Sequence, residues 1–248
     1  MTERADVSTE GRPSKALVTG AAREGGIGAA IAARLDAAGM EVVTLDVEPG
    51  CTFQVDVVSE DLPALHDIDV CVCNAGLPTI FGAAHSMDLT RWRRDLDVNL
   101  TGSFRIAQAC LGGMRERRFG RIVVMSSIAA GYGMPAQVAY SASKAGLLGM
   151  VKTIAVENAW LGITANAILP GLVGSASVLS MPPEIIDVWL ARIPIGRVIS
   201  PAEVAEAVAY FASPAAGSVT GQELLIDGGQ SLNQLSVTRS VLRGRQEP

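Results

Sequence analysis

Aromatic side chains make up only 4% of this chain of 248 residues, and the chain has only two histidines. No apolar run approaches the roughly 20 residues that a membrane-spanning helix needs, so we expect no membrane partner. The formal net charge is −5 and no basic stripe occurs, which argues against nucleic acid as the main partner. The polar N-terminal segment lacks the apolar stretch of a signal peptide, and we therefore expect a cytoplasmic protein.

Cysteine is sparse as well, since the chain has only Cys51, Cys71, Cys73 and Cys110. Cys71 and Cys73 lie in an apolar run, DVCVCNAG, and we predict that strand alternation directs them to opposite faces. A metal site made by this pair is therefore not expected. Buried thiols in a reducing compartment are the preferred interpretation.

Hydrophobic residues make up 49% of the chain, and small aliphatic side chains supply most of them. This composition suits buried parallel strands packed under helices. The expected strands are 15–20, 40–46, 52–57, 68–76, 120–127, 163–171 and 221–229. The expected helices are 27–39, about two turns within 58–67, 89–114, 139–162 and 201–213.

Strands that alternate with helices at this pitch predict right-handed βαβ crossovers. The fold class is therefore α/β, with a doubly wound parallel sheet of seven strands and helices on both faces. Neither a repeat nor a linker divides the pattern. We predict a single domain over 15–231, a flexible tail over 1–14 and a C-terminal tail over 232–248.

The segment TGAAREGGIG, residues 19–28, follows the first strand and precedes the first helix. Glycines there let the backbone approach a pyrophosphate, and the helix N-terminus favours negative charge. Its spacing is not the common G-x-G-x-x-G, and an ordinary strand-to-helix turn is the alternative. Asp46, at the end of the second strand, favours the nucleotide, because a carboxylate there accepts hydrogen bonds from ribose hydroxyls.

A second constellation is Tyr140-Ser-Ala-Ser-Lys144. Residues i and i+4 share a helix face, so the ammonium of Lys144 is expected near the phenol of Tyr140. A nearby cation favours the phenolate and lowers the pKa of the tyrosine toward the working range. Such a pair is usually a surface contact, but Ser127, at the end of the fifth strand, supplies a hydroxyl at the same sheet edge.

Seven short motifs occur together between residues 15 and 231. They are TG…GIG, NAG (74–76), DVN (97–99), Ser127, YSASK, PG (170–171) and IDGG. In this order and spacing the chain resembles the short-chain dehydrogenase/reductase family. The resemblance implies a Rossmann fold and an NAD(P)-dependent oxidoreductase that transfers a hydride between nicotinamide and an alcohol or ketone.

The resemblance also implies the catalytic roles. Tyr140 corresponds to the general acid-base, and Lys144 lowers its pKa and binds the nicotinamide ribose. Ser127 hydrogen-bonds the substrate oxygen, with Ser126 as the less favoured choice. Asn99 holds the water that links Lys144 to solvent.

The implied cofactor contacts extend along the whole strand edge. The cofactor-binding residues are Gly20, Arg23, Gly26, Ile27, Gly28, Asp46, Asp56, Val57, Asn74, Ala75, Gly76, Tyr140, Lys144, Pro170, Gly171, Val173 and Ser175. Three features depart from the family pattern. The turn has five residues between Gly20 and Gly26 where the family usually has three, Cys73 replaces an asparagine, and the helix within 58–67 is short.

Two residues compete over the choice of cofactor. Asp46 favours NAD because its charge repels a 2′-phosphate, whereas Arg23 could pair with that phosphate in NADP. In NADP-dependent relatives the basic residue usually stands directly before the second motif glycine, and here that residue is Gly25. NAD is therefore the predicted cofactor, with NADP as the alternative.

The substrate pocket is expected to be apolar, which suggests a neutral secondary alcohol or ketone. The candidate lining residues are Leu77, Tyr132, Met134, Leu172, Leu179, Met181 and Trp189. An alternative is a 3-oxoacyl-[acyl-carrier-protein] reductase that binds its acidic carrier through the basic segment MRERRFGR, although that segment also suits a solvated helix end. A non-catalytic nucleotide-binding protein is the third hypothesis. The resemblance further implies a homo-oligomer, a tetramer or dimer built on the two long helices.

Overall fold

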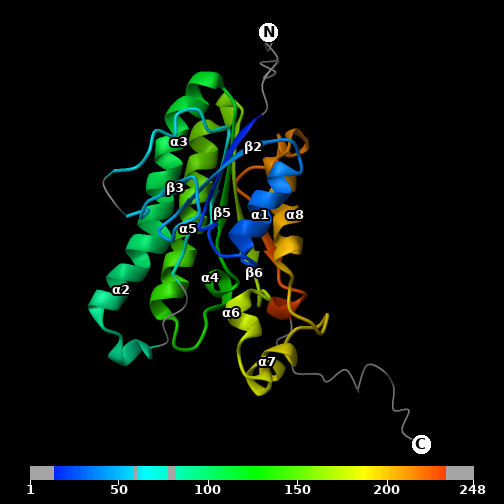
Figure 1. The fold of residues 1–248 in the computed structure, drawn as a ribbon. Helices are drawn as coiled ribbons and strands as arrows, with labels where there is room; N and C mark the ends of the chain where they lie inside the picture. Colours follow the sequence, from blue (N-terminus) through cyan, green and yellow to red (C-terminus); the bar gives the residue numbers. More distant parts are fainter. Residues whose placement is uncertain (1–13, 59–60, 78–81, 233–248) are drawn as a thin grey trace, which may run out of the picture.

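The computed structural model describes residues 14–58, 61–77 and 82–232 (Figure 1). Apart from Ser14 and Leu232, the two expected tails lie outside the described residues. Within the described part, no helix is long and apolar enough to cross a bilayer.

Seven parallel strands form one sheet in the order β3-β2-β1-β4-β5-β6-β7. The strands are β1 Lys15–Thr19, β2 Glu41–Asp46, β3 Phe53–Gln54, β4 Val70–Cys73, β5 Gly120–Met125, β6 Ile163–Pro170 and β7 Glu223–Ile226. The predicted α/β class, the seven-stranded parallel sheet and the single domain are confirmed. The strand order reverses between β1 and β4, and ligands of such sheets bind at the carboxyl ends beside this reversal.

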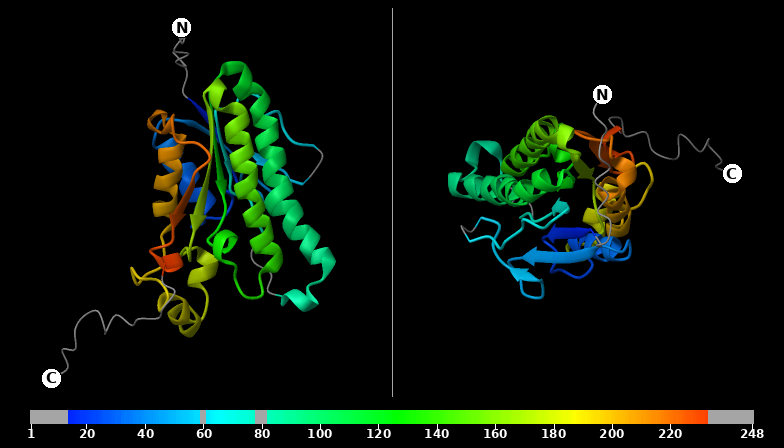
Figure 2. Two further views of the ribbon diagram at one scale, coloured as in Figure 1. Left: turned by 180° about the vertical axis from the view of Figure 1, so that it is seen from behind. Right: turned by 90° about the horizontal axis from the view of Figure 1, so that it is seen from above.

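Helices cover both faces of the sheet (Figure 2). On one face α1 packs against α8, and on the other face α2, the π-helical segment η2 and α3 lie beside α5. The longer helical elements are α1 Ile27–Asp36, α2 Leu89–Leu96, η2 Asp97–Gly102, α3 Ser103–Arg117, α5 Val138–Asn158 and α8 Pro201–Ala212.

Shorter helices gather mainly where the strands end. They are α4 Ala129–Tyr132, α6 Ala176–Leu179 and α7 Pro183–Leu190, with 3₁₀ turns at Ala84–Ser86, Ala159–Leu161, Pro214–Ala216 and Gln230–Leu232. Figure 1 shows α4, α6 and α7 at the end of the molecule toward which the strands run. This end therefore holds the candidate site.

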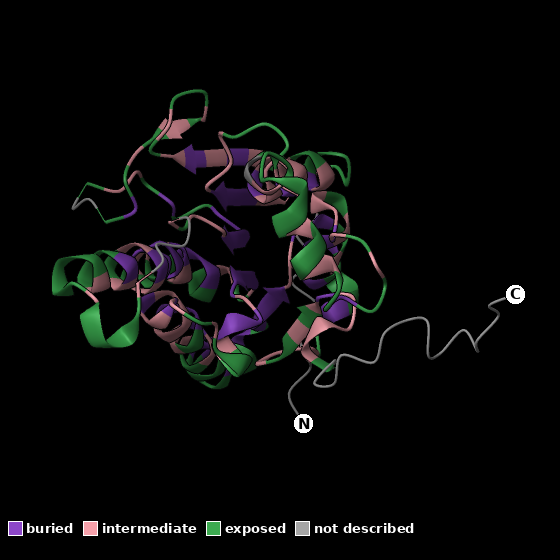
Figure 3. Cartoon of the chain, turned by 90° about the horizontal axis from the view of Figure 1, so that it is seen from below, coloured by how far each residue is buried: buried purple, intermediate pink, exposed green. Residues whose placement is uncertain are grey.

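The sheet separates two hydrophobic cores. Val70 and Val72 of β4 pack into the core beneath α1 and α8. Cys71 and Cys73 point into the other core, beneath α3 and α5. Seen from below, the central strands are buried, whereas the edge strands are partly exposed and the outer helix faces are exposed (Figure 3).

The prediction for Cys71 and Cys73 is wrong as to their faces. Their Sγ atoms lie 3.8 Å apart on the same face, because side chains two positions apart along a strand point in the same direction. Both thiols are buried, as predicted.

Two other expectations for this half of the chain need correction. The predicted strand 52–57 is reduced to Phe53–Gln54, and residues 61–67 contain no helix where about two turns within 58–67 were predicted. Leu65 lies in an irregular segment, and its side chain is nevertheless buried. The predicted helix 89–114 is longer and consists of α2, η2 and α3 in succession, ending at Arg117.

Candidate active site

Asn74 joins the two turns that flank the reversal in strand order. Its Nδ2 donates to the carbonyl oxygens of Thr19 and Gly20, both at 2.9 Å. The backbone N–H groups of Asn74 and Ala75 in turn donate to Thr19 Oγ1, both at 3.0 Å. The turn after β4 is therefore held rigidly against the turn after β1.

The glycine turn is packed closely enough to require its glycines. A Cβ on Gly28 would lie 2.1 Å from the carbonyl oxygen of Gly20, and a Cβ on Gly20 would lie 2.7 Å from Cα of Ala75. Helix α1 begins directly behind this turn, without a side-chain cap and without an acidic residue in its first turn. Its N-terminal N–H groups and the positive end of its dipole are thus open to an anion.

The two extra residues of this turn form a small turn of their own. The N–H of Gly26 donates to the carbonyl oxygen of Arg23 at 3.0 Å, and Gly25 has a φ of +70°, which glycine adopts readily. The guanidinium of Arg23 points to Glu48, with which it forms a salt bridge. Asp46 accepts hydrogen bonds from the N–H groups of Ala22 and Glu48, at 2.9 and 3.0 Å.

A cavity of about 310 Å³ lies at the carboxyl ends of β1, β4, β5 and β6. Its lining combines the edge of the glycine turn with the residues of the two motifs. They are Ile27, Asn74, Gly76, Leu77, Met125, Ser126, Ser127, Tyr140, Lys144, Pro170, Gly171, Leu172, Val173, Ser175 and Val178. The structure therefore brings Ser127, Tyr140 and Lys144 together, as the sequence predicts.

Ser127 and Tyr140 line the same cavity, and the side chain of Ser127 interacts with the Tyr140 phenol. Burial raises the pKa of Tyr140 above its ordinary value, and the neighbouring Ser127 side chain opposes that rise. The buried carboxyl group of Asp95 raises the pKa of Tyr140 further. Ser126 is directed elsewhere, since its hydroxyl donates to the carbonyl oxygen of Lys144 at 2.9 Å.

Lys144 is buried beside Tyr140, four positions away on α5. Its Nζ lies 5.7 Å from the centroid of the Tyr140 ring and donates to the carbonyl oxygen of Met125 at 2.7 Å. Burial lowers the pKa of Lys144 to about 8. The pKa of Tyr140 is thus raised where a lowering was expected, with desolvation as the largest cause.

Asn99 is fully buried in the π-helical segment η2 and does not line the cavity. Its Oδ1 accepts from the N–H of Leu77 at 2.9 Å, and its Nδ2 donates to Ser143 Oγ at 3.2 Å. A Cβ on Gly76 would lie 3.0 Å from Asn99 Oδ1 and 3.6 Å from Lys144 Nζ. Asn99 and Lys144 therefore approach Gly76 together.

The cofactor residues predicted on the adenosine side lie outside the cavity. Asp46 stands at the end of β2, and the side chain of Val57 is buried against Gly102. Asp56 is exposed next to it.

The substrate residues divide into two groups. Leu77 and Leu172 line the cavity, whereas Tyr132, Met134, Leu179, Met181 and Trp189 do not. Sequence reasoning missed Met125 and Val178, which do line it, and Asp95, which is buried with an unpaired Oδ1. Met125 ends β5, whereas the predicted strand 120–127 continued to Ser127.

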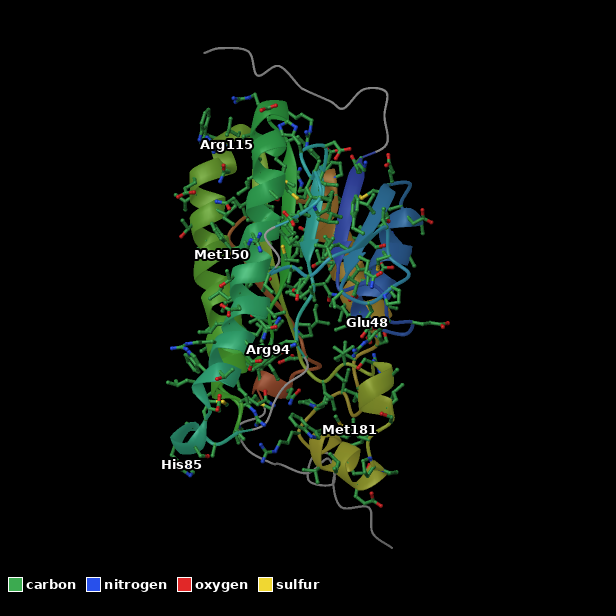
Figure 4. All side chains as sticks on the ribbon, turned by 60° about the vertical axis from the view of Figure 1, so that its left-hand side comes forward. Glu48, His85, Arg94, Arg115, Met150 and Met181 are labelled. Atoms are coloured by element: carbon green, nitrogen blue, oxygen red, sulfur yellow. The ribbon has the colours of Figure 1, made fainter. Side chains whose placement is uncertain are left out.

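The basic segment of the carrier hypothesis lies at the other end of the sheet. Figure 4 shows Arg115 at one end of the molecule and Met181, which follows α6, at the other. Arg117 donates to Asp69 at 3.0 Å, and Arg115 donates to Asn158. Arg118 stacks on the ring of Trp160. These guanidinium groups are therefore bound within the subunit.

Comparison with known proteins gives a consistent result along nearly the whole chain. A family model described as enoyl-(acyl carrier protein) reductase matches residues 54–231. The chain is 39% identical over 237 residues to an acetoacetyl-CoA reductase of Rhizobium meliloti (strain 1021), covering 87% of this chain and 97% of the relative. It is 37% identical over 238 residues to a cis-4-hydroxycyclohexanecarboxylate dehydrogenase of Sinomonas cyclohexanicum, with 86% and 95% covered.

A solved structure agrees with these sequence relatives. It is the crystal structure of an oxidoreductase of the short-chain dehydrogenase/reductase family from Burkholderia thailandensis. Its TM-score is 0.80 at 32% sequence identity, covering 94% of this chain and 96% of that chain.

Proposed function

Because the chain belongs to the short-chain dehydrogenase/reductase family, we propose that it is an NAD-dependent enzyme that interconverts a secondary alcohol and a ketone. The observation that carries this proposal is the single cavity that Ser127, Tyr140 and Lys144 line together. Three side chains capable of holding and moving a proton thus meet beside a helix N-terminus that is open to a phosphate.

The residues around the cavity fit a nicotinamide dinucleotide. The glycine turn cannot hold a larger residue at position 20 or 28, and α1 presents uncapped N–H groups to a pyrophosphate. The group would be held by Gly20, Gly26, Ile27 and Gly28 at the phosphates, Asp46, Asp56 and Val57 at the adenosine, and Asn74, Ala75, Gly76, Tyr140, Lys144, Pro170, Gly171, Val173 and Ser175 toward the nicotinamide. When bound, it supplies the acceptor or donor of the hydride.

Tyr140 is the general acid-base in this proposal. Its oxygen removes the proton from the alcohol during oxidation and returns a proton to the carbonyl oxygen during reduction. Ser127 donates a hydrogen bond to the same substrate oxygen and stabilises the negative charge that develops on it. Their place in one cavity supports this division of roles.

Lys144 and Asn99 support Tyr140 from behind. The pKa of Lys144 is lowered to about 8, so its ammonium can give up and regain a proton near neutral pH. Asn99 anchors the turn at Leu77 and is linked to α5 through Ser143. In the proposal Asn99 holds the water through which Lys144 exchanges protons with solvent.

NAD is the proposed cofactor because Asp46 stands at the end of β2. A ribose hydroxyl can donate to this carboxylate, whereas a 2′-phosphate would meet a fixed negative charge. The nearest cation, Arg23, is already paired with Glu48.

The substrate is proposed to be neutral and apolar around the reacting carbon. Leu77, Leu172 and Val178 line the cavity. Beyond it, the segment of α6 and α7 exposes Leu179 and Ile185 at the same end of the molecule. The cyclic hydroxy acid in the name of the Sinomonas relative belongs to the secondary alcohols.

A 3-oxoacyl thioester is the second candidate substrate, since the Rhizobium relative is an acetoacetyl-CoA reductase. Its ketone would bind at Ser127 and Tyr140 in the same way, so the chemistry does not separate the two candidates. Binding of a carrier protein through Arg115 and its neighbours is less favoured, because these arginines are engaged within the subunit. A purely nucleotide-binding role does not explain why Ser127, Tyr140 and Lys144 line one cavity.

The test measures turnover of a panel of cyclic and linear secondary alcohols with NAD⁺ or NADP⁺, and of acetoacetyl-CoA with NADH or NADPH. The reaction is followed by the absorbance of the reduced nicotinamide. Tyr140→Phe should lower kcat by about 10² or more while cofactor binding is kept. The exposed Tyr210 of α8 offers a matched control, and Tyr210→Phe should leave kcat unchanged. Turnover of Tyr140→Phe near the wild-type rate would refute the mechanism.

The enzyme is also proposed to be a homo-oligomer, as a tetramer or a dimer. Helices α3 and α5 expose apolar side chains on the face that they turn away from the sheet. Phe104 of α3 and Val156 of α5 are exposed by 43% and 82%, and Trp160, in the 3₁₀ turn directly after α5, is exposed by 66%. Burial of this surface against a second copy would remove it from water.

A further inference from the structure

A pair of opposite charges stands beside Asp46, at the rim of the cofactor turn. Nε and Nη2 of Arg23 both donate to Oε1 of Glu48, at 2.9 and 2.5 Å. Arg23 belongs to the glycine turn, and Glu48 lies two residues beyond the end of β2, where Figure 4 labels it. The pair therefore bridges the two segments that border the expected adenosine ribose.

The backbone sets these two side chains opposite each other. Asp46 accepts the N–H of Ala22, directly before Arg23, and the N–H of Glu48. The turn closed by Gly26 onto Arg23 fixes the direction in which the chain leaves Ala22. The carboxylate of Asp46 thus holds the backbone next to Arg23 and the backbone of Glu48. The inserted turn then directs the Arg23 side chain toward Glu48.

The charges at this rim do not balance. Asp46 and Glu48 carry two negative charges, whereas Arg23 carries one positive charge. A guanidinium is the group best suited to bind a phosphate, through paired N–H donors. Here two of the donors of Arg23 are already used by Glu48, so a 2′-phosphate would have to displace a carboxylate to reach them.

We propose that Glu48 is a specificity-determining residue, which withholds Arg23 from the 2′-phosphate of NADP. This inference rests on the proposed NAD-dependent function. Asp46 acts on the phosphate directly by repulsion, whereas Glu48 acts through Arg23. The two effects are therefore separable by substitution.

The test uses equilibrium dissociation constants of NAD⁺ and NADP⁺ for the full chain, measured by calorimetry without turnover. Glu48→Gln removes the charge of the carboxylate and keeps the size of the side chain. Binding of NADP⁺ should become about fivefold tighter, the size expected from an exposed ion pair, and binding of NAD⁺ should stay within about twofold. Glu24→Gln is the matched control, because it removes one negative charge from the same turn without releasing Arg23, and it should leave the ratio unchanged.

A double-mutant cycle separates the action through Arg23 from a simple change of charge. If Glu48 acts through Arg23, the gain in NADP⁺ binding should vanish in the Arg23→Gln, Glu48→Gln double variant. Arg23→Gln alone should hardly change NADP⁺ binding, since its guanidinium is withheld in the parent enzyme. A gain that persists in the double variant would overturn the inference.

The result also distinguishes failure of this inference from failure of the proposed function. If the parent chain binds neither dinucleotide or prefers NADP⁺, the proposed function fails and the inference fails with it. If the parent chain prefers NAD⁺ but Glu48→Gln leaves the ratio of the two dissociation constants unchanged, only the inference fails. Melting temperatures of all variants within a few degrees of the parent show that the turn remains folded.

Discussion

Gly76 stands where Asn99 and Lys144 approach the turn after β4. In Gly76→Ala the new methyl group would lie 3.0 Å from Asn99 Oδ1, so the asparagine must move and with it the backbone of Leu77 that it holds. We expect kcat to fall by about tenfold to 10²-fold, because small misplacements at a reacting centre are costly. Steady-state kinetics on a secondary alcohol would measure this loss.

The control for this substitution lies on the helix that carries Lys144. Gly149→Ala places its methyl group in open space, and we expect unchanged kcat and slightly higher stability, since alanine is the better helix former. Equal losses in both variants would show that the effect of Gly76→Ala is not local to Asn99.

Because of Lys144, the stability of the protein should depend on pH in the alkaline range. Its pKa is lowered from 10.5 to about 8 in the folded chain, so between these values the unfolded chain binds more protons and stability rises with pH. Below pH 8 the burial of the charge costs about 3 kcal/mol, taken from this shift of the pKa from 10.5 to about 8. Lys144→Met should therefore have a higher unfolding free energy than the parent. This increase should be about 2 to 3 kcal/mol larger at pH 7 than at pH 10.

Denaturant unfolding at the two pH values would measure that difference. Lys152→Met is the control, because Lys152 is an exposed partner of Glu223 and its replacement removes no buried charge. A pH-independent effect of Lys144→Met would contradict the assigned burial of its charge.

Residues whose chemistry depends on type and spacing could be predicted from the sequence. Tyr140 and Lys144 share a helix face wherever that helix lies, and Ser127 follows a strand that had to end at the same edge. Val178 and Asp95 could not be predicted in this way. Whether an apolar side chain lines a cavity, or a carboxyl group is buried, depends on how α6 and α2 pack against other elements.

At the scale of the element, helix α8 has the best defined start. Ser200 Oγ accepts the N–H of Glu203 at 3.2 Å, and Glu203 Oε2 accepts the N–H of Ser200 at 2.8 Å, which together form a capping box. Ser200→Ala should lower the unfolding free energy by about 1 kcal/mol. Ser213→Ala at the other end of α8 removes only a bond to the carbonyl oxygen of Tyr210 and should cost less.

Both variants are compared by denaturant unfolding at neutral pH. Equal losses would indicate that the capping box does not determine the stability of α8.

Elements with a strong hydrophobic period were predictable, and short ones were not. The strands beneath both helical layers are buried on both faces and read as apolar runs. By contrast, β3 lies at the sheet edge, where the pairing of Leu45 with Phe53 and of Asp46 with Gln54 determines its length. The π-helical turns of η2 arise within a continuous helix, which the apolar pattern does not distinguish from α-helix.

At the scale of the whole molecule, the exposed face of α3 and α5 is the proposed subunit contact. Val156→Glu places a charge on this face, and we expect the oligomer to dissociate to smaller species because the charge would lose its hydration on association. Light scattering coupled to size-exclusion chromatography would measure the change. Val188→Glu on α7 is the control, since it adds the same charge to an exposed site elsewhere and should leave the mass unchanged.

The parallel, doubly wound character of the sheet could be predicted, because it follows from crossover handedness and from the alternation of strands and helices. For the proposed contact between two copies, the sequence predicted only that the helices carry an excess of apolar residues. One side of each helix is buried against the sheet, and the hydrophobic pattern does not indicate what contacts the opposite side.

The order of the strands along the chain bears on how the protein is made. Gly20, Asp46 and Asn74 come from the first four strands, whereas Ser127 and Tyr140 follow β5 and Pro170 ends β6. During synthesis on the ribosome, the segments for the adenosine half therefore emerge well before those for the reacting half. A chain interrupted before β5 would therefore contain Gly20, Asp46 and Asn74 but none of Ser127, Tyr140 and Lys144.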